Sequence, residues 1–262
     1  MARTIAITGK GGVGKTTVAA LIVRYLEDSA AGPILALDAD PDCNLGSVLG
    51  IDVEQTIGGL REELLKEMKD LPPGMSKQQY IEAGLHQIVV ETPKLDLITM
   101  GRGEGPGCYC FVNILLRKFA EDLAPSYQWV VMDNEAGMEH ISRRTTSQID
   151  DLIVVVNANP LSHDCARRID RLLDGLGREV RDRYFLLNAT SPKLADAVRE
   201  KLADLSLEYL GCLPRDEALE DLAFEGKSIF ALQDGPALQG IWQAMDRIMG
   251  RTARPIRAEQ VQ

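Results

Sequence analysis

Residues 9–17 read GKGGVGKTT, which fits the phosphate-binding pattern G-x-x-x-x-G-K-[ST]. An apolar run over residues 3–8 precedes this stretch, and a helical pattern over residues 18–26 follows it. This order of strand, loop and helix is the context that the pattern requires. The backbone N–H groups of such a loop, together with the N-terminus of the next helix, bind phosphate oxygens. The stretch therefore predicts an α/β fold that binds a nucleoside triphosphate.

The side chains of this loop have separate expected roles. Lys15 supplies positive charge to the β and γ phosphates, and the Thr16 hydroxyl can hold Mg²⁺. A second lysine, Lys10, is not needed to hold phosphate within one chain, so its partner can lie elsewhere. The nucleotide-binding residues expected here are Gly11, Gly12, Val13, Gly14, Lys15, Thr16 and Thr17.

Short apolar runs alternate with helical patterns along the rest of the chain. Several runs, such as LIVVV at residues 152–156, are apolar without alternation, as expected for parallel strands that helices cover on both faces. We expect one doubly wound α/β domain over residues 1–250 with a mostly parallel central sheet. An insertion at about residues 55–87 and a flexible tail over residues 251–262 complete the prediction. The strands are expected at residues 4–8, 34–38, 95–100, 129–133, 152–157, 184–188 and 207–210.

Composition excludes several classes of protein. A formal net charge of −10 opposes non-specific binding to nucleic acid, and no basic stripe compensates for it. No apolar run approaches the roughly 18 residues of a membrane span, and the N-terminal residues are too few for a signal sequence. We therefore expect a cytoplasmic protein without nucleic-acid or membrane partners. Five cysteines in a reducing compartment do not indicate a disulfide framework.

The string KGGVGKTT at residues 10–17 resembles the deviant P-loop ATPases, the group of MinD, ParA, ArsA and the nitrogenase iron protein. The resemblance implies that Lys10 reaches across a homodimer to the partner's nucleotide, so that dimerisation depends on nucleotide. Residues 37–44, LDADPDCN, look like switch I of the same group. Asp40 is the candidate for orienting the attacking water, and Asp38 for supporting the Mg²⁺ shell. With Lys10 and Lys15, Asp40 completes the expected catalytic set. Asn44 either caps the next helix or senses nucleotide.

Residues 130–137, VVMDNEAG, form an apolar strand that closes on an aspartate, which is the Walker B pattern followed by switch II. Asp133 would hold Mg²⁺ through water, and the Gly137 backbone N–H would meet the γ phosphate. Relatives often read DTPAG here, so Asn134 and Glu135 depart from that spelling. Further on, Asn188 at a strand end and the run Pro214, Arg215 and Asp216 resemble the group's adenine-binding elements, which favours ATP over GTP.

A C-x-C motif at Cys108 and Cys110 separates the candidate functions. Two thiols at this spacing can point the same way, but a closed site for a soft metal usually needs four ligands. A two-fold dimer would supply four thiolates on its axis, suited to Ni²⁺, Zn²⁺ or Cu⁺. The C-x-C motif and Lys10 therefore both predict a homodimer.

Together, KGGVGKTT, DADPD, the C-x-C motif and DNEAGMEH closely resemble the CooC-type ATPases, over about residues 3–249. That family comprises maturation factors that bind nickel and help load carbon monoxide dehydrogenase. The resemblance implies an ATP-dependent metallochaperone that binds Ni²⁺, with Zn²⁺ possible at the same cysteines, and has carbon monoxide dehydrogenase as its client. ATP would close the dimer and assemble the thiolates, and hydrolysis would release the metal.

Two other classes of function stay open. An iron–sulfur cluster bridging a dimer would also use axial cysteines, but the nitrogenase iron protein needs a second cysteine after switch II, and residues 134–148 contain none. A MinD- or ParA-like positioning ATPase predicts a basic face or an amphipathic tail, and the sequence shows neither. The roles of Cys43 in switch I and of His140, a possible transient ligand, are open.

Overall fold

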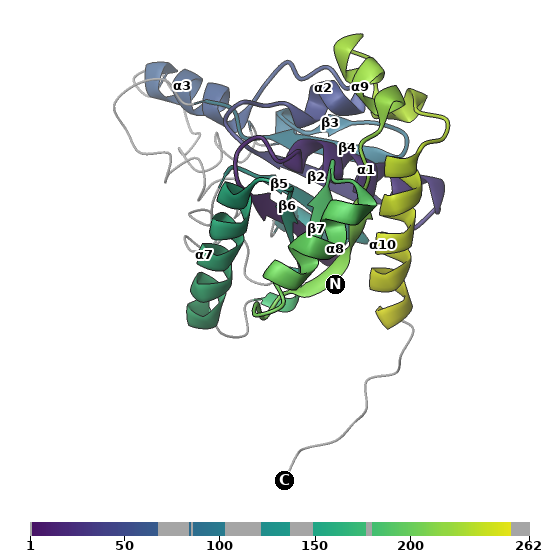
Figure 1. Cartoon of the computed structure of the whole chain (residues 1–262). Coiled ribbons are helices and arrows are strands. Elements are labelled where there is room, and N and C mark those ends of the chain that lie inside the picture. Colours follow the sequence, from purple (N-terminus) through teal and green to yellow (C-terminus); the bar gives the residue numbers. More distant parts are fainter. Residues whose placement is uncertain are drawn as a thin grey trace.

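The central sheet has eight strands in the order β3-β4-β2-β5-β1-β6-β7-β8 (Figure 1). All neighbouring strands run parallel except β3 and β4, which are antiparallel. The strands are β1 (Arg3–Gly9), β2 (Ile34–Ala39), β3 (Val90–Glu91), β4 (Leu95–Thr99), β5 (Trp129–Asn134), β6 (Ile149–Val156), β7 (Val180–Asn188) and β8 (Glu208–Leu213). The computed structural model describes residues 2–67, 84, 86–102, 122–136, 149–176 and 180–252.

Helices cover both faces of this sheet (Figure 1). The described helices are α1 (Lys15–Asp28), α2 (Leu45–Leu49), α3 (Ile57–Glu67), α7 (Pro160–Leu176), α8 (Pro192–Lys201), α9 (Glu217–Phe224) and α10 (Pro236–Thr252), with short 3₁₀ turns η1 (Ala124–Ser126) and η3 (Ile229–Ala231). Side chains of α1 and α10 pack over one face of the sheet, and side chains of α3, α7 and α8 pack over the other.

The middle strands are apolar without alternation because both of their faces are buried. In β6, Leu152 and Val154 pack in the layer of α7 and α8, whereas Ile153 and Val155 pack in the layer of α1 and α10. The expected doubly wound, mostly parallel fold is therefore confirmed. The short antiparallel edge strand β3 was not expected.

The sequence analysis predicted the starts of two strands several residues too late. β6 begins at Ile149 and β7 at Val180, several residues before the expected starts at 152 and 184. The early residues of both strands are charged, as in Asp150, Asp151 and Arg181, which made them read as loops. The structure pairs these charges across strands and so keeps them in the sheet. β8 also differs, because it ends at Leu213 rather than at residue 210.

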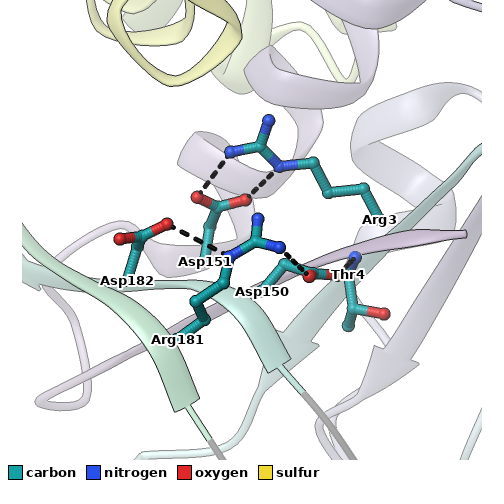
Figure 2. Close-up of polar contacts among 6 residues, drawn as sticks. All are labelled: Arg3, Thr4, Asp150, Asp151, Arg181 and Asp182. Carbon is teal, nitrogen blue, oxygen red and sulfur yellow. Dashed lines mark hydrogen bonds and ion pairs between the residues drawn. The ribbon is translucent and has the colours of Figure 1, made fainter. Parts of the chain in front are cut away.

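A charge cluster holds the amino ends of β1, β6 and β7 together (Figure 2). Arg3 donates from Nε and Nη2 to the two carboxylate oxygens of Asp151, at 2.6 and 2.8 Å. The Asp151 side chain is fully buried and that of Arg3 is 11% exposed. Burial raises the pKa of Asp151, and the Arg3 guanidinium opposes that rise. Next to this pair, Arg181 contacts Asp150 at 3.0 Å, so the strand that leads into the phosphate loop is anchored at its far end.

Replacing Asp151 with Asn should destabilise the protein by about 3 kcal/mol, because breaking a buried ion pair leaves the guanidinium without its counter-charge. Urea unfolding followed by circular dichroism would measure the change. Asp182→Asn is the matched control, since Asp182 also pairs with an arginine but its side chain is 34% exposed. The control should cost less than about 1 kcal/mol. Equal losses in the two variants would contradict the assigned role of the buried pair.

Candidate functional site

The carboxyl ends of the parallel strands meet along one side of the sheet, called here the carboxyl edge. In doubly wound folds ligands bind beyond this edge. The loop from Gly9 to Gly14 leaves β1 there and leads into α1. A Cβ on Gly9 would lie 2.5 Å from the Val155 carbonyl oxygen of β6, and Gly14 has a φ of 88° in the left-handed region. Both positions therefore require glycine.

The two lysines of the loop lie in different surroundings. Lys15 is the first residue of α1 and is only 7% exposed, so its charge is held beside the loop. Lys10 is partly exposed, and its ammonium lies 3.4 Å from the Gly11 carbonyl oxygen. Its reach to a partner subunit remains a prediction.

Asp38 and Asp133 are paired in register on the adjacent strands β2 and β5, and both are at most 1% exposed. The Asp38 carboxylate accepts hydrogen bonds from the backbone N–H groups of Asp40, at 3.1 Å, and Leu45, at 2.9 Å. Both carboxylate oxygens of Asp133 are buried and have no hydrogen-bond partner of good geometry within the described part of the chain, although the Thr16 hydroxyl is near enough to affect the carboxylate's pKa. Buried carboxylates normally have donors or a cation as partners. Asp133 is thus a buried carboxylate that a cation could balance.

The protonation of this pair follows from its burial. Burial raises the pKa of Asp38 to about 6, and the backbone donors of Leu45 and Asp40 oppose the rise. Burial also raises the pKa of Asp133 to about 7; the Thr16 hydroxyl and the Lys15 ammonium act against the shift, and the nearby charge of Asp38 adds to it. A divalent cation would relieve the repulsion between the two carboxylates.

The donor set fits Mg²⁺ bound together with a nucleotide. Mg²⁺ is usually held by one or two carboxylates, with waters and substrate phosphates completing its shell. Thr16, Asp38 and Asp133 would provide the protein side of such a site. Among the described residues, no three or more His, Cys, Asp or Glu side chains gather as a metal cluster.

Switch I is shaped by Asp38 rather than by Asn44. The Asn44 side chain makes no capping hydrogen bond to α2, so the capping alternative for Asn44 is wrong. Asp38 binds the Leu45 N–H at the start of α2 instead, a role that the sequence analysis missed. Asp40 is partly exposed, and one of its carboxylate oxygens accepts the Asp42 N–H at 3.0 Å. Cys43 has a φ of 55° and donates its thiol to the Pro41 carbonyl at 3.4 Å.

The expected adenine elements separate into two groups. Asn188 ends β7 and donates its amide to the Val13 carbonyl of the phosphate loop at 2.8 Å, so it lies directly beside that loop. Asp216 caps α9 and accepts the N–H groups of Leu219, at 3.3 Å, and Ala237, at 3.0 Å.

Arg215 forms a double hydrogen bond with Glu220, at 2.7 and 2.8 Å, and Pro214 follows β8 directly. Adenine contacts by Asn188, Pro214, Arg215 and Asp216 stay predictions. Four further predicted or candidate residues, Cys108, Cys110, Gly137 and His140, lie outside the described residues.

A glycine-dependent loop at the centre of a parallel sheet, with a buried acid pair beside it, defines a P-loop nucleotide-binding protein of the α/β class. The chain belongs to the CobQ/CobB/MinD/ParA nucleotide binding domain family, whose pattern matches residues 4–229.

Two relatives align with most of the chain. It is 40% identical to an ATP-binding protein of Methanocaldococcus jannaschii, over 88% of this chain and 91% of the relative. It is 29% identical to the carbon monoxide dehydrogenase accessory protein CooC of Rhodospirillum rubrum, over 87% of this chain and 89% of CooC.

Among solved structures, the MinD cell division protein of Aquifex aeolicus has a TM-score of 0.67 at 24% identity, covering 99% of this chain and 100% of that chain. This likeness supports the fold. Within the described ranges, no helix combines the length and apolar character needed to cross a bilayer.

Replacing Asp133 with Asn should have opposite effects on stability and on Mg²⁺ binding. At pH 8 the nucleotide-free variant should be more stable than the wild type by about 2 kcal/mol, because the buried charge is removed. Because the pKa of this carboxyl group is higher in the folded than in the unfolded protein, the wild type loses stability as pH rises from about 4 to about 7. The stability advantage of Asp133→Asn over the wild type should therefore shrink as pH falls through that range. Urea unfolding at pH 5.5 and pH 8 would measure it.

The same variant should bind ATP at least about 10-fold more weakly when Mg²⁺ is present, which titration with a fluorescent ATP analogue would detect. Asp164→Asn, a change at an exposed carboxylate of α7, is the control and should alter neither property. A variant that loses stability at pH 8 would show that Asp133 is paired in the folded protein.

Proposed function

We propose that this protein is an ATP-hydrolysing metallochaperone that binds Ni²⁺ at Cys108 and Cys110 of a nucleotide-dependent homodimer and assists nickel insertion into carbon monoxide dehydrogenase. The observation that carries the proposal is the C-x-C motif in a chain that aligns with CooC over 87% of its length. Zn²⁺ is an alternative metal, because thiolates bind both ions.

The ATPase half of the proposal is supported by the geometry of the carboxyl edge. Phosphoryl transfer depends chiefly on positioning and on neutralising the charge of the phosphates. The burial of Lys15 and of the acid pair beside the loop supports their proposed roles in binding the phosphates and Mg²⁺. Asp40 follows β2 at the same edge and is the proposed residue for orienting the attacking water. Lys10 of the partner subunit would add a further positive charge.

A route from the nucleotide to the cysteines is supported by contacts of switch I with the end of β4. The Met100 N–H donates to the Asp38 carbonyl at 2.8 Å. Asp42 forms an ion pair with Arg102, and Cys108 follows Arg102 by six positions in the sequence. A movement of switch I on hydrolysis would therefore pull on the chain that leads to the C-x-C motif.

Anaerobic Ni²⁺ titration, with and without ATP and Mg²⁺, tests the metal site. The wild type should bind one Ni²⁺ per two chains, and the double variant Cys108→Ser/Cys110→Ser should lose this binding while still hydrolysing ATP. Cys165→Ser/Cys212→Ser is the matched control, because it also removes two thiols and should keep the metal. Size-exclusion chromatography would report the dimer in each sample.

Equal metal binding by the wild type and the Cys108/Cys110 variant would show that the motif is incidental. That result would favour a MinD- or ParA-like positioning ATPase. A visible absorption band from an iron–sulfur cluster in the anaerobically purified protein would favour a redox ATPase instead.

Replacing Arg102 with Ala should weaken the coupling between nucleotide and metal. We expect ATP to change Ni²⁺ affinity at least about 3-fold less in this variant than in the wild type, since a coupling of this kind is typically worth 1–3 kcal/mol in total. Arg102→Lys keeps the positive charge and should retain more of the effect. Competition with a chromogenic Ni²⁺ chelator would measure both variants, and an unchanged ATP effect in Arg102→Ala would rule out this route.

A further inference from the structure

Strands β1 and β5 separate at the carboxyl edge, next to the candidate site. Their pairing ends at Ile7 with Asp133, whereas β1 continues alongside β6 as far as Gly9 with Val155. On its other side, β5 stays with β2 until Asn134 pairs with Ala39. The phosphate loop therefore leaves one side of this split, and the residues after Asn134 leave the other.

The side chain of Asn134 lies at the split itself. It is 1% exposed, and its amide nitrogen donates to the Ile7 carbonyl at 3.0 Å, with a longer contact of 3.5 Å to the Met132 carbonyl. This bond continues the link between β5 and β1 after their ladder has ended. Asn134 thus fixes the direction in which the chain leaves β5 relative to the phosphate loop.

The amide oxygen of Asn134 is buried and accepts no hydrogen bond from the described residues. Leaving a buried acceptor unsatisfied costs about 1–3 kcal/mol. Native structures contain few such groups, and those that persist need a reason such as a catalytic role or strain. A side chain that provided only the bond to Ile7 would not need this oxygen.

Asn134 also lies between two residues of the candidate site. Asp133, immediately before it, is the buried carboxylate proposed to face Mg²⁺. Ala136, two positions after it, lies against the phosphate loop, since a Cβ on Gly11 would be 3.7 Å from the Ala136 Cβ. A change in the position of Asn134 would therefore move the metal-facing carboxylate and the start of switch II together.

We propose that Asn134 is a positioning residue for ATP hydrolysis in this protein. Its amide nitrogen ties the start of switch II to β1, and its buried oxygen is the acceptor for a donor that the nucleotide-bound state supplies. The inference rests on the proposed ATPase activity. It assigns a role to one of the two residues, Asn134 and Glu135, at which this chain departs from the DTPAG spelling: threonine offers one hydroxyl, whereas asparagine offers a donor and an acceptor on separate atoms.

Three variants at this position separate the two functions of the amide. Asn134→Asp keeps the shape but removes the donor, Asn134→Ala removes both groups, and Asn134→Thr keeps a single short donor. The steady-state kcat and KM for ATP would be measured with Mg²⁺, together with the affinity for a fluorescent ATP analogue and the thermal stability. Asn159→Ala is the matched control: Asn159 is exposed in the turn after β6, and its side-chain oxygen accepts the Leu161 N–H at the start of α7, so this variant also removes one side-chain hydrogen bond.

We expect kcat to fall at least about 10-fold in Asn134→Asp and Asn134→Ala, with ATP-analogue affinity within about 3-fold of the wild type. The kcat of Asn134→Thr should lie between those of these variants and that of the wild type. Asn159→Ala should keep the wild-type kcat and affinity and lose only about 1 kcal/mol of stability, because it removes a helix cap. A wild-type kcat in Asn134→Ala overturns the inference. So does a parallel loss of stability and affinity with kcat unchanged, which would show a structural role only. A wild type that does not hydrolyse ATP would instead overturn the ATPase proposal and this inference with it.

Discussion

The burial of two neighbouring carboxylates, Asp38 and Asp133, is the constraint on which the candidate site depends. Neighbouring parallel strands hold them side by side in register, and the sheet and its helices exclude water from both. Without a cation, burial raises the pKa of Asp133 to about 7. At neutral pH about half of the molecules therefore have this carboxyl group protonated. The folded protein stores an unfavourable charge arrangement that Mg²⁺ with a nucleotide would relieve.

Burial elsewhere in the fold offsets the free-energy cost of these two buried carboxylates. Apolar strands covered on both faces supply most of the burial that stabilises the domain. At the opposite edge of the sheet, the buried Asp151 carboxylate is paired with the mostly buried guanidinium of Arg3, which has the opposite charge. The sheet therefore has one edge where charges are matched and one where they are not, and the unmatched edge is the one that carries the phosphate loop. This contrast is typical of a functional site, where residues that bind a ligand lower the stability of the unliganded protein.

The sequence predicted the phosphate loop, the parallel sheet and the two aspartates because each depends on local patterns: glycine spacing, apolar runs and acids at strand ends. It failed where a contact joins distant segments. The charged starts of β6 and β7 read as loops, since their partners lie on other strands. The Asn44 side chain was one candidate for capping α2, but the hydrogen bond to the Leu45 N–H at the start of α2 comes from the carboxylate of Asp38, on the preceding strand. The bond from Asn134 to Ile7 spans 127 positions, and no spacing rule reveals it.

Asp38 shows how this edge can couple binding to movement. The two oxygens of its carboxylate hold the backbone of switch I at Asp40 and Leu45, and its own carbonyl holds Met100 at the end of β4. A cation that drew the carboxylate towards Asp133 would compete with those backbone donors for the same lone pairs. Binding at the metal position and the conformation of switch I therefore share one side chain, and a change in either must alter the free energy of the other.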